Sequence, residues 1–411
     1  MSVEILTFGC RLNAFESEVM RGHAQAAGLD DTFIINTCAV TAEAERQARQ
    51  AIRRVHREHP GAKIVVTGCA VQIDAARWSH LPGVTRVLGN VEKLQAGNWE
   101  STEPRLVSDI MNVRQTAAHL IEGFGTRARA FVEIQQGCDH RCTFCVIPYG
   151  RGPSRSIPMG VIADQIRVLV GKGYHEIVLT GVDLTSYGTD LPGSPRLGQL
   201  VRRLLAAIPE LSRLRLSSID PAEIDEDLWH AFGSEKRLMP HLHLSVQSGS
   251  NMILKRMKRR HLRCHVIEAA DRARTLRPDV ALGADLIAGF PTEDDAMFAD
   301  TLSLIEEAHL DYLHVFPFSA RSRTPAARMP PLPMAERRAR AALLREAGAR
   351  RVTARFRAMI GRQLPVLAES PDAGHAEDFA PVRFSTPVVA GRIVSATIIG
   401  ADERGLFAGA T

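Results

Sequence analysis

Three cysteines lie close together in the stretch CDHRCTFC, at positions 138, 142 and 145. The usual thiolate sites, zinc or cubane iron–sulfur, take four ligands. A 4Fe–4S cluster held by Cys138, Cys142 and Cys145 leaves one iron without a protein ligand, and that iron can chelate a small molecule. The competing interpretation is zinc, with His140 or another histidine as the fourth ligand. No second pair of ligands at short spacing lies nearby, so the pattern favours iron–sulfur.

Three further cysteines each follow a short apolar run rich in β-formers. Cys10, Cys38 and Cys69 end VEILTFGC, TFIINTC and KIVVTGC, and helical patterns separate these runs. Such alternation predicts a parallel α/β domain, in which the strands end at the same ligand-binding edge and bring the three cysteines together. The alternative is that three unrelated cysteines end core strands. Cys264 stands alone in a helical pattern and is interpreted as a partly buried small hydrophobe.

Six candidate strands alternate with helical patterns in the middle of the chain. They are 131–136, 176–181, 213–218, 242–247, 282–290 and 312–318. Because a closed TIM barrel needs eight β/α units, six units predict an open, partial (β/α)6 barrel. The CDHRCTFC stretch follows the first of these strands and would lie at the C-terminal face, where barrel active sites are built.

The patterns divide the chain into four segments. An N-terminal α/β domain at 1–96 is followed by a polar linker at 97–127, the barrel at 128–357 and a small all-β domain at 358–411. A basic, alanine-rich helix at 334–357 closes the barrel region. The last segment has short β runs between Gly, Pro and Asp, which suit either a small RNA-binding barrel or a structural cap.

Charge and composition restrict the binding partners and the cellular compartment that we expect for the protein. There are 51 Lys and Arg against 46 Asp and Glu, and a net charge of +5 does not by itself indicate nucleic acid. Basic runs at 255–261 and 337–357 are either solvated helix faces or contacts for a polyanionic partner. No apolar stretch of about 18 residues occurs, so no membrane span is expected. Seven cysteines, an odd number, and a start without a secretory signal predict a cytoplasmic protein without a disulfide framework.

The stretch CDHRCTFC on the first strand of a six-unit barrel resembles the radical S-adenosylmethionine superfamily. In that superfamily S-adenosylmethionine occupies the open iron, and one electron releases a 5′-deoxyadenosyl radical. With FGCRLNAFESE, VVTGCAVQ, LTGVDLTSYG and GADLIAGFPTE, the whole chain resembles the methylthiotransferases, which end in an RNA-binding TRAM domain. The resemblance implies two 4Fe–4S clusters, with Cys10, Cys38 and Cys69 holding an auxiliary one that carries the sulfur to be transferred. Ala14 stands where the family commonly has Gln.

The resemblance also implies a reaction and a substrate. One S-adenosylmethionine methylates sulfur at the auxiliary cluster, and another activates a C–H carbon of the substrate. The sequences of the motifs are most similar to those of the branch that modifies C2 of N6-threonylcarbamoyladenosine at tRNA position 37. Other branches modify N6-isopentenyladenosine at that position or an aspartate of a ribosomal protein. We expect a tRNA substrate, an external electron donor and a monomer; the non-enzyme alternatives are an iron–sulfur or a zinc-bound RNA-binding protein.

Candidate contacts for S-adenosylmethionine lie beside the cysteine loop and at strand ends. By resemblance, Phe144 and the backbone around Val146 meet the adenine. The residues that end strands two to five and face the same mouth are Thr180, Gly181, Ser217, Gln247, Asp285 and Gly289. Each polar one is alternatively a satisfied barrel-lining residue. Arg151 and Arg155 follow the loop and are candidates to pair with a carboxylate or phosphate, or to form a loop salt bridge.

Overall fold

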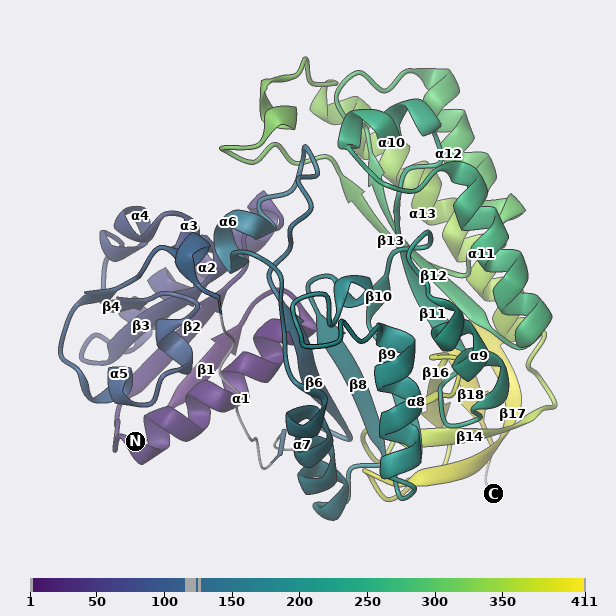
Figure 1. Cartoon of the computed structure of the whole chain (residues 1–411), viewed down its shortest axis with the longest axis horizontal. Helices are drawn as coiled ribbons and strands as arrows, with labels where there is room; N and C mark the ends of the chain where they lie inside the picture. The colour runs from purple at the N-terminus through teal and green to yellow at the C-terminus, as the bar shows by residue number, and fades with distance from the viewer. Residues whose placement is uncertain (1–2, 115–122, 125–126, 410–411) are drawn as a thin grey trace.

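The N-terminal segment folds into a parallel sheet with the strand order β1–β2–β3–β4–β5 (Figure 1). The computed structural model describes residues 3–114, 123–124 and 127–409. Alternate residues of the fully buried β2 pack against different helices: Ile34 against Met20 of α1, and Ile35 against Ile52 of α2. The elements are β1 (Glu4–Thr7), α1 (Arg11–Ala26), β2 (Thr32–Thr37), α2 (Ala42–Glu58), β3 (Lys63–Gly68), α3 (Cys69–Ile73), α4 (Ala75–Ser79), β4 (Val84–Leu88) and the 3₁₀ turn η1 (Glu92–Leu94).

The segment expected to be a linker contains regular structure. It includes α5 (Gly97–Glu100), β5 (Arg105–Leu106) and η2 (Ile110–Asn112), and β5 pairs with β4. The N-terminal sheet therefore extends past the boundary expected at residue 96. Residues 115–122 and 125–126 of the expected linker lie outside the described residues. The four-segment division stays a prediction.

The six central strands form an open, partial barrel, which confirms the expected fold. They are β6 (Arg129–Gln136), β8 (Glu176–Gly181), β9 (Arg213–Leu216) with β10 (Ser218–Ile219), β11 (His241–Gln247), β12 (Ala281–Ala288) and β13 (Tyr312–Pro317). The third strand is interrupted at Ser217, so the wall consists of two sheets, β7–β6–β8–β9 and β10–β11–β12–β13. These six strands pair in parallel, and only the short β7 (Arg155–Ser156) is antiparallel to its neighbour among the described residues of this wall.

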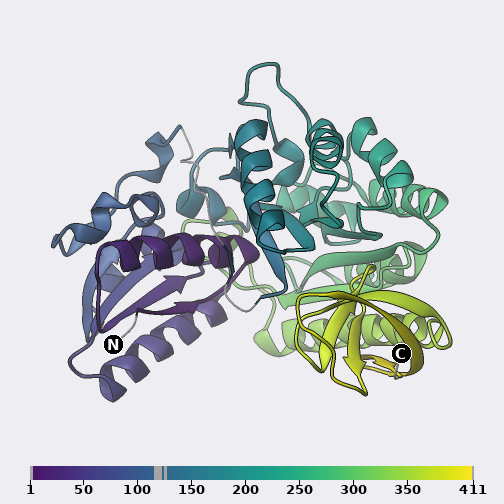
Figure 2. The ribbon, with the colours of Figure 1, turned by 90° about the horizontal axis from the view of Figure 1, so that it is seen from below.

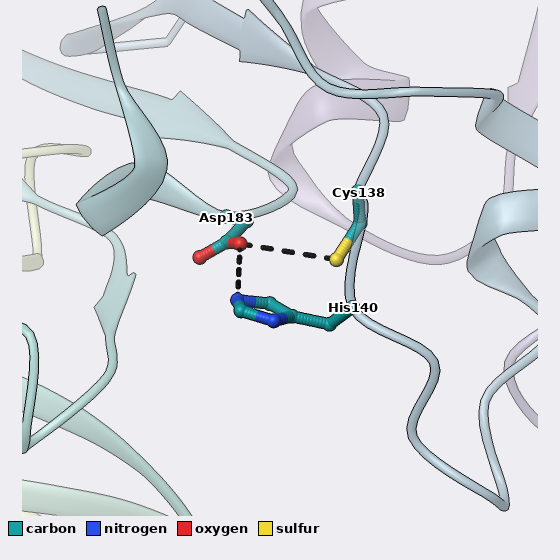
Figure 3. A group of neighbouring side chains, drawn as sticks. All are labelled: Cys138, His140 and Asp183. Atoms are coloured by element: carbon teal, nitrogen blue, oxygen red, sulfur yellow. Dashed lines mark hydrogen bonds and ion pairs between the residues drawn. The ribbon is translucent and has the colours of Figure 1, made fainter. Parts of the chain in front are cut away.

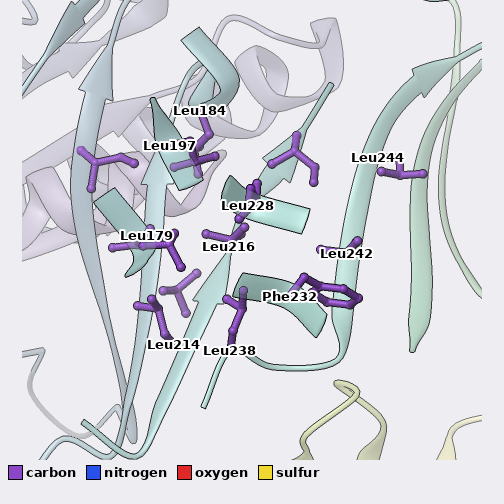
Figure 4. Packing of buried hydrophobic residues seen from close by; sticks show 14 of the residues in the cluster. Leu179, Leu184, Leu197, Leu214, Leu216, Leu228, Phe232, Leu238, Leu242 and Leu244 are labelled. Carbon is purple, nitrogen blue, oxygen red and sulfur yellow. The ribbon is translucent and has the colours of Figure 1, made fainter. Parts of the chain in front are cut away.

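Helices between the strands cover the outside of this wall (Figure 1). They are α7 (Met159–Gly171), α8 (Leu197–Ala207), α9 (Glu226–Ser234), α10 (Asn251–Met257), α11 (Arg263–Leu276), α12 (Asp295–Glu307) and α13 (Met334–Arg357), with 3₁₀ turns η3 (Leu184–Ser186) and η4 (Pro325–Arg328). The short α6 (Ile147–Arg151) instead packs against α3 of the N-terminal domain. Figure 4 shows the leucine-rich packing between strands and helices, in which Leu214 and Leu216 of β9 lie near Leu228 and Phe232 of α9. This continuous core fixes the strand ends that carry the site.

The C-terminal segment is a small closed barrel in the order β14–β15–β16–β18–β17. Its strands are β14 (Gln363–Ala368), β15 (Ala373–Ala376), β16 (Pro381–Phe384), β17 (Ile393–Asp402) and β18 (Gly405–Ala408). It packs below the central barrel (Figure 2), where Arg215 donates to the Glu377 carbonyl at 3.0 Å and Arg213 to the Pro365 carbonyl at 2.9 Å. The Phe379 ring lies 5.4 Å from the ring of His241, the first residue of β11, and so closes the N-terminal end of the lumen.

Candidate functional site

The first three cysteines all follow the carboxyl ends of neighbouring parallel strands, as the sequence predicted. Cys10 precedes α1, Cys38 follows β2 and Cys69 begins α3. Gly9 lies so close to Cys38 that a Cβ added to it would be 2.6 Å from the Cys38 Cβ and 2.8 Å from its Sγ. Because Gly9 also has a φ of +98°, only glycine lets the Cys10 turn approach Cys38 this closely.

Hydrogen-bond donors are directed at the sulfurs of this triad. The Arg151 Nε donates to Cys69 Sγ at 3.2 Å, the Asn90 amide to the same sulfur at 3.7 Å, and the Val40 backbone N–H to Cys38 Sγ at 3.4 Å. Burial raises the pKa of the Cys38 thiol to about 12, so the isolated thiol is neutral. Donors to sulfur favour the thiolate form that binds metal, and this donor set therefore suits a thiolate-held cluster.

Arg151 belongs to a buried charge network behind Cys69. It forms an ion pair with Glu16 of α1 and donates to the Asn13 Oδ1 at 2.5 Å, and Lys93 Nζ donates to the second Glu16 oxygen at 2.7 Å. Arg151, Glu16 and Lys93 are each at most 2% exposed. Arg151 thus forms a salt bridge within the protein, and its partner carboxylate lies in the N-terminal domain and not in the loop; pairing with a ligand carboxylate or phosphate stays a prediction. Arg155 instead donates to the backbone carbonyls of Pro153 and Arg151.

The second triad lies on the loop between β6 and α6. The Cys138 N–H bonds to the Gly152 carbonyl at 3.1 Å and closes the base of this loop. Here too donors reach sulfur: the Ile147 N–H lies 3.4 Å from Cys145 Sγ, and Arg259 Nη1 lies 3.7 Å from Cys142 Sγ. Both triads therefore present cysteines whose sulfurs already accept hydrogen bonds, which suits thiolate ligation.

A histidine and a carboxylate lie beside Cys138 (Figure 3). His140 Nε2 is 2.8 Å from Asp183 Oδ2, and the Cys138 thiol donates to the same oxygen at 3.8 Å. The hydrogen bond to Asp183 raises the pKa of His140 and favours its charged form, which cannot ligate zinc. Among the described residues, the group of possible ligand atoms within 4.8 Å of one another contains Cys138 without Cys142 or Cys145. It is not the Cys₃His set that the zinc interpretation requires.

A cavity of about 430 Å³ joins the first triad to the barrel mouth. Cys10 and Cys38 line it from the N-terminal sheet edge, together with Arg11. The barrel side is lined by Thr180, Gly181, Ser217, Ser218, His243, His314 and Phe316. This size is typical of small-molecule sites, and the partly open space connects residues from two domains.

Asp285 holds two of the cavity-lining imidazoles. Its Oδ1 is 3.0 Å from His243 Nε2 and 3.2 Å from His314 Nδ1. Burial works to raise the pKa of Asp285, but the hydrogen bonds to His243 and His314 outweigh it and keep that pKa below its ordinary value. Asp285 is therefore an anion that orients both rings.

The other predicted cofactor contacts lie away from this cavity. Phe144 packs in a cluster with Phe290 and Phe318, and the Val146 side chain is buried in the N-terminal core. A Cβ on Gly289 would collide with Arg337 of α13, which explains the need for glycine there. Gln247, at the end of β11, has a φ of +70°. Cofactor contacts by these residues and by Thr180, Gly181, Ser217 and Asp285 stay predictions.

Sequence reasoning did not identify Arg11, His243 or His314 as residues of the site. His243 and His314 stand on strands that were predicted, and the alternation of HLHLSVQ puts His243 on the same strand face as Gln247. That signal was present in the sequence. Arg11 had no comparable signal, because its neighbour Cys10 alone marks the position and nothing local shows where its long side chain points.

Comparison with known proteins places this geometry in a family. A model of the Radical SAM superfamily matches residues 132–305, which include the second triad, and a model of the Uncharacterized protein family UPF0004 matches residues 2–89, which include the first. The chain is 51% identical over 401 residues to the threonylcarbamoyladenosine tRNA methylthiotransferase MtaB of Rickettsia prowazekii, covering 97% of this chain and 95% of that protein. The chain belongs to the radical S-adenosylmethionine methylthiotransferase family.

Two further relatives and one solved structure match most of the length of this methylthiotransferase. The protein of the same name from Thermotoga maritima is 37% identical over 90% of this chain and 86% of its own. The tRNA-2-methylthio-N(6)-dimethylallyladenosine synthase of Cereibacter sphaeroides is 36% identical, covering 89% of this chain and 86% of its own. The structure of the radical S-adenosylmethionine methyltransferase TsrM from Kitasatospora setae aligns with a TM-score of 0.56 at 12% identity, over 79% of this chain and 74% of that one, and shows a shared fold.

Family membership confirms that the chain is an enzyme and that its cofactors are S-adenosylmethionine and 4Fe–4S clusters. The non-enzyme alternatives are therefore wrong. The electron donor, the monomeric state and the assignment of individual cysteines to the clusters stay predictions. No helix among the described residues combines the length and apolarity needed to cross a bilayer.

Many arginines of the two basic runs of this methylthiotransferase form hydrogen bonds or ion pairs within the protein. In the first, Arg259 Nη2 lies 2.7 Å from Asp220, and in α13 the buried Arg340 lies 2.8 Å from Glu293. Further arginines of α13 that bond to the barrel or the C-terminal domain are Arg337, Arg345, Arg351 and Arg355. Much of this charge is thus engaged internally, and neither run is a continuous surface for a polyanion. The exposed members are Lys255, Lys258, Arg260, Arg338, Arg345, Arg350 and Arg357.

Proposed function

We propose that this enzyme attaches a methylthio group to C2 of N6-threonylcarbamoyladenosine at position 37 of tRNA. The observation that carries the proposal is the 51% identity, over nearly the whole of both chains, to a relative named for that substrate. The relative named for the dimethylallyl substrate is 36% identical. Identity at this level over the full length favours the threonylcarbamoyl branch.

Two cysteine triads are proposed to hold the two clusters. Cys138, Cys142 and Cys145 would hold the one that binds S-adenosylmethionine, and Cys10, Cys38 and Cys69 the auxiliary one. When bound, these groups supply the electron, the methyl group and the sulfur of the reaction. The donors to Cys38, Cys69, Cys142 and Cys145 support this assignment, because hydrogen bonds to sulfur stabilise negative charge there.

The protein's own residues hold the two cysteine triads in position and line the cavity beside them. The network of Arg151, Glu16 and Lys93 connects the loop of the second triad to the sheet edge of the first, so that the two sites are held in one arrangement. The cavity would let a substrate base approach Cys10 and Cys38 from the barrel side. Asp285 fixes the His243 and His314 rings on the wall that such a base would contact.

The tRNA itself is proposed to bind through dispersed positive charge and the C-terminal barrel. Exposed lysines and arginines neutralise phosphates without reading sequence. On the C-terminal barrel, the Arg383 guanidinium lies 4.0 Å from the centre of the Phe407 ring, beside a surface hollow that also includes Phe384 and Ile399. Arginine and aromatic side chains of this kind stack on unpaired bases.

Nucleoside mass spectrometry of tRNA from cells lacking the gene tests this proposal. We expect 2-methylthio-N6-threonylcarbamoyladenosine to disappear and its unmodified precursor to accumulate. The wild-type gene should restore it, whereas Cys138→Ala should not. Loss of the methylthio group from isopentenyladenosine instead would assign the enzyme to that branch. Unchanged tRNA nucleosides together with an unmethylthiolated ribosomal-protein aspartate would assign it to the third.

A further inference from the structure

Arg11 extends from the N-terminal domain into the lumen of the central barrel. It is the first residue of α1 and follows Cys10 directly. Its side chain lines the cavity that Cys10 and Cys38 share with the barrel. The guanidinium carbon lies 5.7 Å from the centre of the Phe379 ring, which closes the far end of the lumen. Arg11 is therefore a cation on the floor of the cavity in which the substrate base is expected.

The guanidinium of Arg11 has no anionic partner among the residues that the structure describes. Neighbouring carboxylates are engaged elsewhere: Glu176 pairs with Arg129 at 3.0 Å and Arg215 at 3.1 Å, and Asp285 accepts from two histidines. A guanidinium carries five N–H donors and stays charged. Arg11 is only partly exposed, and a bound anion would supply the acceptor that the described chain does not provide.

A second unsatisfied group lies in the same cavity. The Ser217 hydroxyl, at the break between β9 and β10, is buried, and within the described chain no group bonds to its Oγ. Native proteins leave few buried polar atoms unpaired, and Ser217 is the one residue with such an atom, among the described residues, that also lines this cavity. Arg11 and Ser217 together indicate a ligand with acceptor oxygens that enters between the two domains.

The substrates of the methylthiotransferase branches differ in what they could offer these groups. The isopentenyl substituent is a hydrocarbon and would leave the guanidinium without a partner. The threonylcarbamoyl substituent ends in a carboxylate, which can accept two parallel hydrogen bonds from a guanidinium. We propose that Arg11 binds the carboxylate of the threonylcarbamoyl group and so selects this substrate over neutral N6-substituted adenosines. This inference rests on the proposed function.

S-adenosylmethionine is another source of a carboxylate, and the lining of the cavity argues against it. Cys10 and Cys38 line the cavity, but none of the described lining residues is Cys138, Cys142 or Cys145. The Arg11 guanidinium therefore faces the space beside Cys10 and Cys38, whereas Thr180, Gly181 and Ser217, which were predicted to contact S-adenosylmethionine, line the barrel side of the same cavity. The substrate is the ligand that must reach this space.

Binding to the holoenzyme without reductant tests the inference, because no turnover then occurs. The ligands are two anticodon stem–loops, one with threonylcarbamoyladenosine at position 37 and one with its neutral methyl ester. We expect the wild-type enzyme to prefer the acid by roughly tenfold to a hundredfold, as hydrogen bonds to charged groups allow. Arg11→Gln should remove this preference, because it should weaken binding of the acid stem–loop and leave binding of the ester stem–loop unchanged. Arg11→Lys should keep part of it, because the charge remains but the planar fork is lost.

Matched measurements separate this effect from misfolding and from the proposed function. Arg21→Gln, on the same helix, is the control and should keep the full preference, because the partly exposed Arg21 side chain pairs with Glu18 and does not line the cavity. Iron content and thermal unfolding show whether the variants are folded and loaded. An equal loss of acid and ester binding in folded Arg11→Gln, an unchanged preference, or weaker S-adenosylmethionine binding would overturn the role of Arg11. A wild-type enzyme that methylthiolates neither stem–loop would instead contradict the proposed function.

Discussion

The Arg151 Nε lies 3.2 Å from the Sγ of Cys69, although 82 residues separate them in the sequence. Arg151 ends α6, which follows the second cysteine triad, whereas Cys69 belongs to the first. The same guanidinium forms an ion pair with Glu16 of α1. One buried arginine thus joins the two halves of the site, and its position ties the geometry of one triad to that of the other.

Replacing this arginine should damage the first triad selectively. Arg151→Met keeps the volume but leaves Glu16 with Lys93 as its one cationic partner among the described residues, beside the Gln136 amide, and breaking a buried pair costs about 3–5 kcal/mol. We expect a lower thermal unfolding temperature and, by Mössbauer spectroscopy, loss of the cluster assigned to Cys10, Cys38 and Cys69. Arg167→Met, which breaks a surface pair with Asp164, is the control and should change neither. Full retention of both clusters by Arg151→Met would refute the coupling.

The two triads should each account for half of the iron. Alanine in place of one triad should lower iron and sulfide to about half, and alanine in place of both should abolish them, because each triad is expected to hold one 4Fe–4S cluster. Cys264→Ala is the matched control, since Cys264 is remote from both triads in the sequence. It was expected to be partly buried, but the structure shows it exposed on α11. Elemental analysis after anaerobic reconstitution gives the result. Stoichiometric zinc, or complete iron loss from either triple variant alone, would contradict two independent sites.

Glu133 should make stability depend on pH. Burial first, and then repulsion from Glu16, raise the pKa of this β6 carboxyl from 4.5 to about 8. Its Oε1 has no hydrogen-bond partner in the described chain. The folded state therefore holds a proton that the unfolded state releases, so stability falls as pH rises from about 4.5 towards about 8.

Glu133→Gln should remove this loss, because the amide does not titrate. The stability of the variant relative to wild type should rise over that pH range and level off above it. Thermal unfolding of the holoenzyme at several pH values measures the difference, with the exposed Glu210→Gln as control. A difference between variant and wild type that does not change with pH would show that Glu133 is already ionised in the folded protein.

Local patterns in the sequence were sufficient for the strands and for the cysteines that follow them. Apolar runs with β-formers set β1, β2 and β3, and a cysteine directly after a parallel strand must lie at the carboxyl edge. The same logic placed the second triad at the mouth of the barrel. These features depend on residues that are adjacent in the chain, and so a single sequence contains them.

Side-chain partners distant in the sequence were not predictable in this way. The arginines of α13 were expected on a solvated face or against a polyanion, but Arg340 pairs with Glu293 and Arg355 with Asp378 of the C-terminal domain. Strand β5 has two residues, too few for a periodic pattern, and therefore fell within the expected linker. Arg11 could not be recognised either, because the cavity that it lines is formed by strands far along the chain.

The central claim, methylthio transfer to threonylcarbamoyladenosine, is tested most directly with the purified enzyme. Enzyme reconstituted with iron and sulfide is given S-adenosylmethionine, a reductant and one of two tRNAs, carrying threonylcarbamoyladenosine or isopentenyladenosine at position 37. Nucleosides are then analysed by mass spectrometry. The account predicts 2-methylthio-N6-threonylcarbamoyladenosine from the first tRNA and little product from the second. Product from the isopentenyladenosine tRNA alone, or from neither tRNA while S-adenosylmethionine is still cleaved, would contradict it.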